Sequence, residues 1–157
     1  SEFLFNMEFP VSTEMPAKKM DELTGKTPEN FLAGLKVLIA EDNVVNVMLM
    51  KKLLLKWSII PTIAENGERA VEFMQSGNFD IILMDLQMPV MNGFDATNEI
   101  RKMADPKKAN VPIIALTASA MAEIKDKVYE AGMNGYVSKP FKPDDLIEKI
   151  QSLTILV

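Results

Sequence analysis

The chain has 157 residues and a formal net charge of −5, and it contains neither cysteine nor histidine. This length suits one domain with a core and a short appendage, and the negative charge argues against the cationic surface that direct nucleic-acid binding needs. The two missing residue types exclude disulfides, thiolate and Ser-His catalysis and the usual ligands of zinc or copper, so neutral-pH chemistry must use carboxylates, lysine, hydroxyls or a hard cation.

Residues 1–33 show no sustained periodicity and contain three prolines, which predicts an N-terminal tail or linker. The first three residues resemble an expression scar and do not bear on the fold. No apolar run approaches the roughly 18 residues of a membrane span, and no signal peptide is visible. We therefore expect a cytoplasmic protein in which residues 34–157 form one domain without membrane contact.

From residue 36 onward, short apolar runs alternate with helix-like segments. The expected order is strand 36–40, helix 44–56, strand 59–64, helix 67 to about 76, strand 81–85, loop 87–93, helix 95–103, strand 111–116, helix 121–131, strand 135–137 and a helix after 143. This alternation is typical of a parallel sheet covered by helices on both faces. It predicts a doubly wound α/β domain with five strands and five helices.

Two of the helices show a pattern of apolar positions. The helix over 44–56 carries Val45, Met48, Leu49 and Leu53 at helical spacing among lysines, which indicates a mixed face beside an apolar one. The last helix is expected to turn four apolar side chains inward, namely Leu146, Ile147, Ile150 and Leu153.

Four of the predicted strands end at polar residues that can do chemistry. Glu41 and Asp42 follow the first strand, Asp85 closes the third, Thr117 follows the fourth and Lys139 follows the fifth. The carboxyl ends of parallel strands face one crevice, so these side chains should converge although they lie far apart in the sequence. The three acids meet only if the first strand neighbours the third, as in the strand order 2-1-3-4-5.

Three carboxylates in one crevice repel one another unless a cation binds or a proton is taken up. A hard divalent ion such as Mg²⁺ suits an all-oxygen site without histidine or cysteine. Lys139 supplies a further positive charge and Thr117 a hydroxyl donor. The set suits the transfer of a phosphoryl group to a carboxylate, a reaction that depends on positioning and charge neutralisation.

Each residue alone also has a structural explanation. Asp42 is equally well placed to cap a helix, Thr117 to belong to a capping segment, and Lys139 to be a solvated surface charge. The functional interpretation depends on their conjunction at four strand ends in the order that one crevice requires.

Four segments resemble the successive motifs of two-component response-regulator receiver domains. They are Leu-Ile-Ala-Glu-Asp-Asn at 38–43, Met-Asp-Leu-Gln-Met-Pro-Val-Met-Asn-Gly at 84–93, Ile-Ile-Ala-Leu-Thr-Ala at 113–118 and Gly-Tyr-Val-Ser-Lys-Pro-Phe at 135–141. The resemblance covers about residues 35–153 and is most like the receivers of hybrid sensor histidine kinases. It implies the flavodoxin-like (CheY-like) fold.

The resemblance also implies a role for each matching residue. Asp85 is the expected phosphoacceptor, Asp42 the main Mg²⁺-binding acid with Glu41 assisting, and the backbone carbonyl of Gln87 a further metal ligand. Two other residues, Thr117 and Lys139, are expected to bind the phosphoryl oxygens.

The resemblance further assigns a switch. Tyr136 matches the aromatic position whose rotamer follows Thr117, which would couple the site to the surface of the fourth helix, fifth strand and fifth helix. An amphipathic tyrosine at a surface edge is the alternative. The Lys139–Pro140 bond is expected to be cis. Beyond self-phosphorylation and autodephosphorylation, no enzymatic activity is expected from these residues.

The phosphoryl donor must lie elsewhere, because a chain without histidine forms no phosphohistidine. We expect a histidine kinase core, a His-containing phosphotransfer domain, or both as partners. The first-helix face near Asn46, Val47 and Met50 is the predicted docking surface, with an ordinary half-exposed helix as the alternative.

Two other functions are weighed against this one. A small-molecule phosphatase with an aspartate nucleophile usually needs an acid two residues further on, where this chain has Gln87. A protein-interaction module that is never phosphorylated (a pseudo-receiver) is the second alternative, and retention of Asp85, Thr117 and Lys139 argues against it.

Overall fold

The computed structural model describes residues 32–119 and 121–154. The predicted tail over 1–33 therefore lies outside the described residues as far as residue 31. Five parallel strands form one sheet in the predicted order β2-β1-β3-β4-β5. The strands are β1 (Val37–Ala40), β2 (Thr62–Ala64), β3 (Ile81–Asp85), β4 (Ile113–Thr117) and β5 (Gly135–Ser138).

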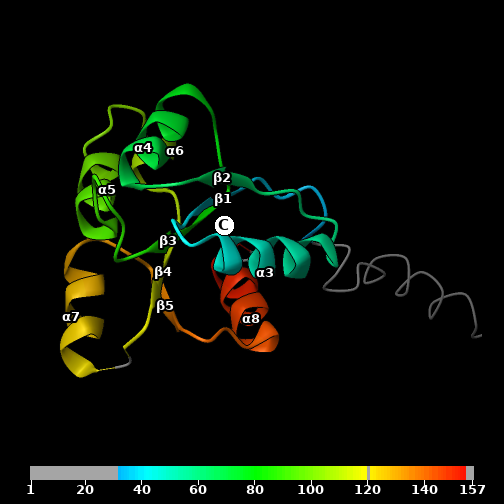
Figure 1. Cartoon of the computed structure of the whole chain (residues 1–157). Helices are drawn as coiled ribbons and strands as arrows, with labels where there is room; N and C mark the ends of the chain where they lie inside the picture. Colours follow the sequence, from blue (N-terminus) through cyan, green and yellow to red (C-terminus); the bar gives the residue numbers. More distant parts are fainter. Residues whose placement is uncertain (1–31, 120, 155–157) are drawn as a thin grey trace, which may run out of the picture. The chain divides into compact units, whose positions relative to one another are not determined.

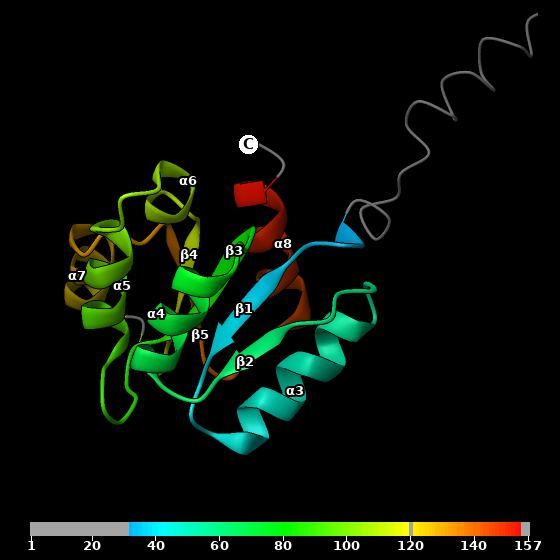
Figure 2. The same cartoon turned by 90° about the horizontal axis from the view of Figure 1, so that it is seen from above.

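Helices cover both faces of the sheet. They are α3 (Val44–Leu55), α4 (Gly67–Ser76), α5 (Gly93–Arg101), α6 (Pro106–Ala109), α7 (Ala122–Glu130) and α8 (Pro143–Thr154). Helices α3 and α8 pack on one face and α4, α5 and α7 on the other (Figures 1 and 2). Within the described ranges none of these helices is both long and apolar enough to cross a membrane.

The five predicted helices are all present, and the described residues contain a sixth. The additional helix, α6, is a single turn of four residues. Pro106 occupies its first turn, and the Asp105 side chain caps it by accepting a hydrogen bond of 2.9 Å from the Lys107 N–H. An Asp-Pro start is a recognised helix signal, but one turn is too short to produce a hydrophobic period.

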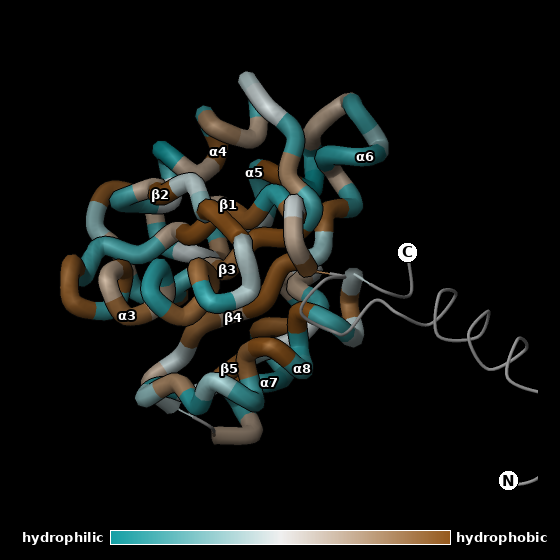
Figure 3. The backbone as a smooth tube through the Cα atoms, turned by 90° about the vertical axis from the view of Figure 1, so that its right-hand side faces the viewer, coloured by the Kyte–Doolittle hydropathy of each residue, from teal (hydrophilic) through white to brown (hydrophobic). Residues whose placement is uncertain are grey.

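The strands are apolar along their whole length because both of their faces are covered. In β1, Leu38 and Ala40 belong to the core beneath α4, α5 and α7, whereas Val37 and Ile39 belong to the core beneath α3 and α8. All four residues are at most 1% exposed. This is the burial expected of a parallel sheet, and the strands form the hydrophobic centre of the tube in Figure 3.

The predicted faces of α3 need correction. The side chains of Val45, Met48 and Leu49 are 72%, 66% and 49% exposed, whereas Met50 is completely buried. Met50 therefore belongs to the core and not to a docking surface. The helix is apolar nearly all round, so spacing alone does not determine which side meets the sheet.

The last helix matches its prediction more closely. In α8, Leu146 and Ile150 are buried, and Ile147 and Leu153 are partly buried against the same core.

The boundaries of two strands differ slightly from the predicted ones. Strand β2 begins at Thr62 rather than at 59, and β4 extends to Thr117.

Candidate functional site

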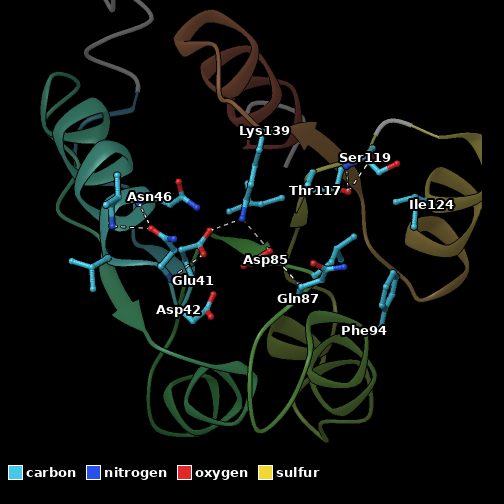
Figure 4. Close-up of a pocket in the computed structure, with 16 residues that line it drawn as sticks. Glu41, Asp42, Asn46, Asp85, Gln87, Phe94, Thr117, Ser119, Ile124 and Lys139 are labelled. Carbon is cyan, nitrogen blue, oxygen red and sulfur yellow. Dashed lines mark hydrogen bonds and ion pairs between the residues drawn. The ribbon is translucent and has the colours of Figure 1, made fainter.

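The three predicted acids meet at the carboxyl edge of the sheet. Strands β1 and β3 are hydrogen-bonded neighbours with Ala40 opposite Met84, so the residues that follow them emerge side by side. Carboxylate oxygens of Glu41, Asp42 and Asp85 all lie within 4.8 Å of one another. Glu41 and Asp85 are buried and Asp42 is exposed, so the cluster opens to solvent on one side (Figure 4).

Lys139 reaches this cluster from β5. Its Nζ lies 3.0 Å from Glu41 Oε2 and 3.2 Å from Asp85 Oδ1. Burial lowers the pKa of Lys139, but the Glu41 and Asp85 carboxylates raise it more, so the pKa lies above its ordinary value. The ammonium thus stays charged at neutral pH and neutralises part of the acidic charge.

The backbone around Lys139 fixes the position of this side chain. The Lys139 N–H donates a hydrogen bond of 2.7 Å to the Thr117 carbonyl, which joins the ends of β5 and β4. The Lys139–Pro140 peptide is cis, as the resemblance implied.

The arrangement of charges fits a divalent metal ion. Three carboxylates and one ammonium leave two negative charges uncompensated when all are ionised. Glu41 Oε2 is buried and makes no hydrogen bond within the described residues, because its contact with Lys139 is an ion pair whose angles miss hydrogen-bond geometry. A buried carboxylate oxygen without a hydrogen bond, beside two further carboxylates, matches the oxygen ligands and charge that Mg²⁺ takes.

Gln87 lines the same cleft. Its N–H donates a hydrogen bond of 3.3 Å to Asp85 Oδ1, and its side chain is exposed. Residue 87 therefore follows Asp85 in a turn that keeps its backbone beside the acids.

The capping role considered for Asp42 belongs to its neighbour. Asn43 is the N-cap of α3, and its Oδ1 accepts hydrogen bonds from the N–H groups of Val45 and Asn46 at 2.9 and 3.1 Å. The Asn43 N–H in turn donates to Glu41 Oε1 at 3.1 Å. Asp42 is thereby left facing the cleft.

Thr117 lies in the cleft with its hydroxyl bonded to the loop after β4. Its Oγ1 donates to the Ser119 carbonyl at 2.9 Å and accepts from the Ser119 N–H at 3.0 Å. The capping alternative fails for Thr117 as well, because the N-cap of α7 is Met121 and has no side-chain cap. The hydroxyl is thus engaged by a local pair of hydrogen bonds to the Ser119 backbone.

Tyr136 lies on β5 beside Ala115 of β4. The ring is half-buried against the core, and the ammonium groups of Lys125 and Lys149 lie 5.3 and 5.8 Å from its centroid. These distances are typical of cation–π contacts. The ring thereby links α7, β5 and α8, and this contact is compatible with either the switch or the surface-edge interpretation.

The cleft around the acids measures about 660 Å³, and apolar side chains line it together with the polar ones. Val44 and Val45 line it from α3. Phe94 lines it from α5 and Ile124 from α7 (Figure 4). Sequence reasoning missed these lining residues, because they come from the starts of three different helices and no local motif marks them.

The sheet order and the acids at its switch point define a receiver domain of the response-regulator type. The family model of the response regulator receiver domain matches residues 37–151, and the chain belongs to this family. Among receivers it is most like those of hybrid histidine kinases. Hybrid signal transduction histidine kinase I of Dictyostelium discoideum is 43% identical over 122 residues, which are 74% of this chain but 7% of that kinase.

Two solved structures have the same fold. The receiver domain of sensor histidine kinase PA1611 from Pseudomonas aeruginosa, with magnesium coordinated in its active-site cleft, has a TM-score of 0.71 and 38% identity, covering 78% of this chain and 98% of that one. The receiver of Saccharomyces cerevisiae Ssk1, crystallised with the phosphotransfer protein Ypd1, has a TM-score of 0.72 and 35% identity, covering 78% and 90%.

Proposed function

We propose that Asp85 is the phosphoacceptor of a two-component phosphorelay and takes its phosphoryl group from a phosphohistidine. The observation that carries this proposal is the convergence of Asp85 with two further acids and the Lys139 ammonium at one sheet edge. Asp85 is 5% exposed, so its carboxylate is held by the sheet while the cleft gives access to a donor.

The chemical step is an in-line displacement. A carboxylate oxygen of Asp85 forms a bond to phosphorus, the phosphorus–nitrogen bond of the donor breaks, and the imidazole leaves with the electron pair and takes up a proton. Lys139 and the Thr117 hydroxyl bind phosphoryl oxygens, and Thr117 must give up its bonds with Ser119 to do so.

Mg²⁺ is the proposed cofactor. Glu41, Asp42 and Asp85 would hold it, with the Gln87 backbone carbonyl as a further ligand. When bound, the ion supplies positive charge to the phosphoryl oxygens. The donor set of this chain supports the proposal, as does the magnesium in the cleft of the PA1611 receiver.

The phosphoryl group would be sensed through Thr117. Movement of its hydroxyl toward the phosphoryl group releases Ser119 and shifts the loop between β4 and α7, which is a local two-state change. Tyr136 connects this region to α7 and α8 through Lys125 and Lys149. We propose that the surface of α7, β5 and α8 is the one that changes.

The proposed partner is a histidine kinase core, a His-containing phosphotransfer domain, or both. The exposed apolar face of α3 beside the cleft, formed by Val44, Val45 and Met48, is the proposed docking surface in place of the buried Met50. The Ssk1 receiver, crystallised with Ypd1, supports a partner of this kind.

We further propose that the chain comes from a hybrid sensor histidine kinase. It spans under a tenth of the length of the first curated relatives it matches, which are such kinases. Residues 1–33 would then be a linker and 34–157 the receiver domain. We also propose that the domain lies in the cytoplasm together with its kinase partner, and the acidic charge gives no basis for direct nucleic-acid binding.

Intact-mass spectrometry after incubation with acetyl phosphate and Mg²⁺ tests the function. The native chain and an Asp126→Asn control, changed at an exposed acid of α7, should gain one labile phosphoryl group. Asp85→Asn should gain none, and no chain should gain it without Mg²⁺. A native chain that gains no adduct and binds no beryllofluoride would instead support the unphosphorylated interaction module.

A further inference from the structure

The loop between β3 and α5, residues 86–92, is closed on itself by backbone hydrogen bonds. The Gly93 N–H donates to the Leu86 carbonyl at 3.2 Å, and the Met91 N–H donates to the Pro89 carbonyl at 2.7 Å. Gln87 lies inside this closed loop and follows Leu86, whose carbonyl accepts the bond from Gly93. A displacement of the far end of the loop is therefore transmitted to residue 87.

The start of α4 holds the far end of this loop. Gly67, the first residue of α4, donates its N–H to the Met91 carbonyl at 3.0 Å. A Cβ at Gly67 would clash with that carbonyl oxygen and would lie 3.0 Å from the carbonyl oxygen of Asn92. Both are backbone atoms, so a side chain at this position displaces either the loop or the helix. Glycine is required here for space.

The helix has little freedom to move away. Ala70 and Met74 of α4 are completely buried against the sheet, and the Asn66 side chain caps the helix by accepting the Arg69 N–H at 2.8 Å. Close-packed interiors resist such shifts, whereas the loop is partly exposed at its tip, where Val90 is 76% exposed. The loop is the part that moves.

We propose that Gly67 is a positioning residue for the metal site: by lacking a side chain it lets α4 set the loop, and hence the Gln87 carbonyl, beside Asp85. This inference rests on the proposed function, in which that carbonyl is a magnesium ligand. Residues that orient metal ligands typically change affinity by about 10- to 100-fold when replaced. Gly67→Ala should weaken Mg²⁺ binding by about tenfold.

The chain offers a matched control at the opposite end of the same helix. A Cβ at Gly77 would lie 3.5 Å from the Phe73 carbonyl oxygen and 3.8 Å from the Phe79 ring, which are ordinary contact distances. Gly77→Ala therefore makes the same chemical change at the C-cap of α4 without a backbone clash and should leave the Mg²⁺ affinity unchanged.

The test is an NMR titration of amide resonances with Mg²⁺, accompanied by thermal unfolding of the metal-free chains. A larger Mg²⁺ dissociation constant for Gly67→Ala, together with a native dissociation constant for Gly77→Ala, supports the inference. An unchanged Mg²⁺ affinity in Gly67→Ala overturns the inference. If the variant has then lost only stability, the role of Gly67 is purely structural. A native chain that binds no Mg²⁺ refutes the proposed function itself.

A second variant keeps the test valid if Gly67→Ala alone does not fold. Val90 has a φ of +69°, which a glycine adopts without strain, so Val90→Gly gives the loop room to accommodate the new methyl group. The double variant should fold and bind Mg²⁺ about tenfold more weakly than Val90→Gly alone. Equal affinities of the two chains would overturn the inference.

Discussion

Replacing Lys139 by methionine removes the charge from the acidic cluster while keeping the length of the side chain. The ammonium contacts Glu41 Oε2 at 3.0 Å and Asp85 Oδ1 at 3.2 Å, and the Glu41 side chain has no solvent exposure. Breaking a buried pair by removing one partner costs about 3–5 kcal/mol. Because the Lys139 side chain keeps 21% exposure, we expect a loss of about 2–3 kcal/mol without metal.

This loss should depend on Mg²⁺. In the absence of the ammonium, a divalent ion offsets two of the three negative charges of the ionised acids, so saturating Mg²⁺ should reduce the difference from the native chain by about half or more.

Urea unfolding with and without Mg²⁺ measures these differences. The control is Lys102→Met, which removes an exposed lysine 3.7 Å from Glu99 and should change stability by less than about 0.5 kcal/mol. A Lys139→Met chain as stable as the native one without metal, or a loss that Mg²⁺ leaves unchanged, would refute the electrostatic account of the site.

Three further predictions concern other parts of the molecule. Arg101 donates hydrogen bonds to the carbonyls of Gly132 and Ala109 at 2.9 and 2.7 Å and to Asn134 Oδ1 at 3.0 Å. Arg101→Met should therefore destabilise the fold by about 2–3 kcal/mol in urea unfolding and leave the Mg²⁺ affinity intact. Unchanged stability would contradict this. Because the pKa of Lys139 is raised in the folded chain, its stabilising charge is fully present below the unfolded pKa of about 10.4 and is lost as the pH rises through the folded pKa. The native chain should therefore lose stability above about pH 10, and Lys139→Met should lack this loss. Met48→Glu on the exposed face of α3 should slow phosphorylation by a phosphotransfer domain but not by acetyl phosphate, and equal slowing of both would count against docking there.

The parts of the fold that follow from local rules were predictable. Apolar runs of strand length that end at Glu41, Asp85 and Thr117 identify buried parallel strands, and the convergence of their carboxyl ends is a property of every such sheet. The convergence of the acids with Lys139 therefore follows from sequence order plus topology. The roles of these residues in catalysis stay predictions until the phosphorylation and metal experiments are done.

The parts that depend on packing were not predictable. Met48 and Met50 are chemically identical, yet one is 66% exposed and the other completely buried, because the position of the sheet selects the face of a helix that is apolar nearly all round. Likewise, Phe94 and Ile124 line the cleft only because separate helices bring them there. No spacing in the sequence encodes such a meeting.

The hydrogen bonds between Thr117 and Ser119 affect the fraction of unphosphorylated molecules that adopt the signalling arrangement. In the proposed switch, the unphosphorylated chain reaches the signalling arrangement only by giving up both bonds, at 2.9 and 3.0 Å. At about 1 kcal/mol each, they keep that arrangement at about 3% of the molecules. The background output of the pathway would then be set by two local bonds, and Ser119, whose backbone forms them, would need no contact with the phosphoryl group to influence it.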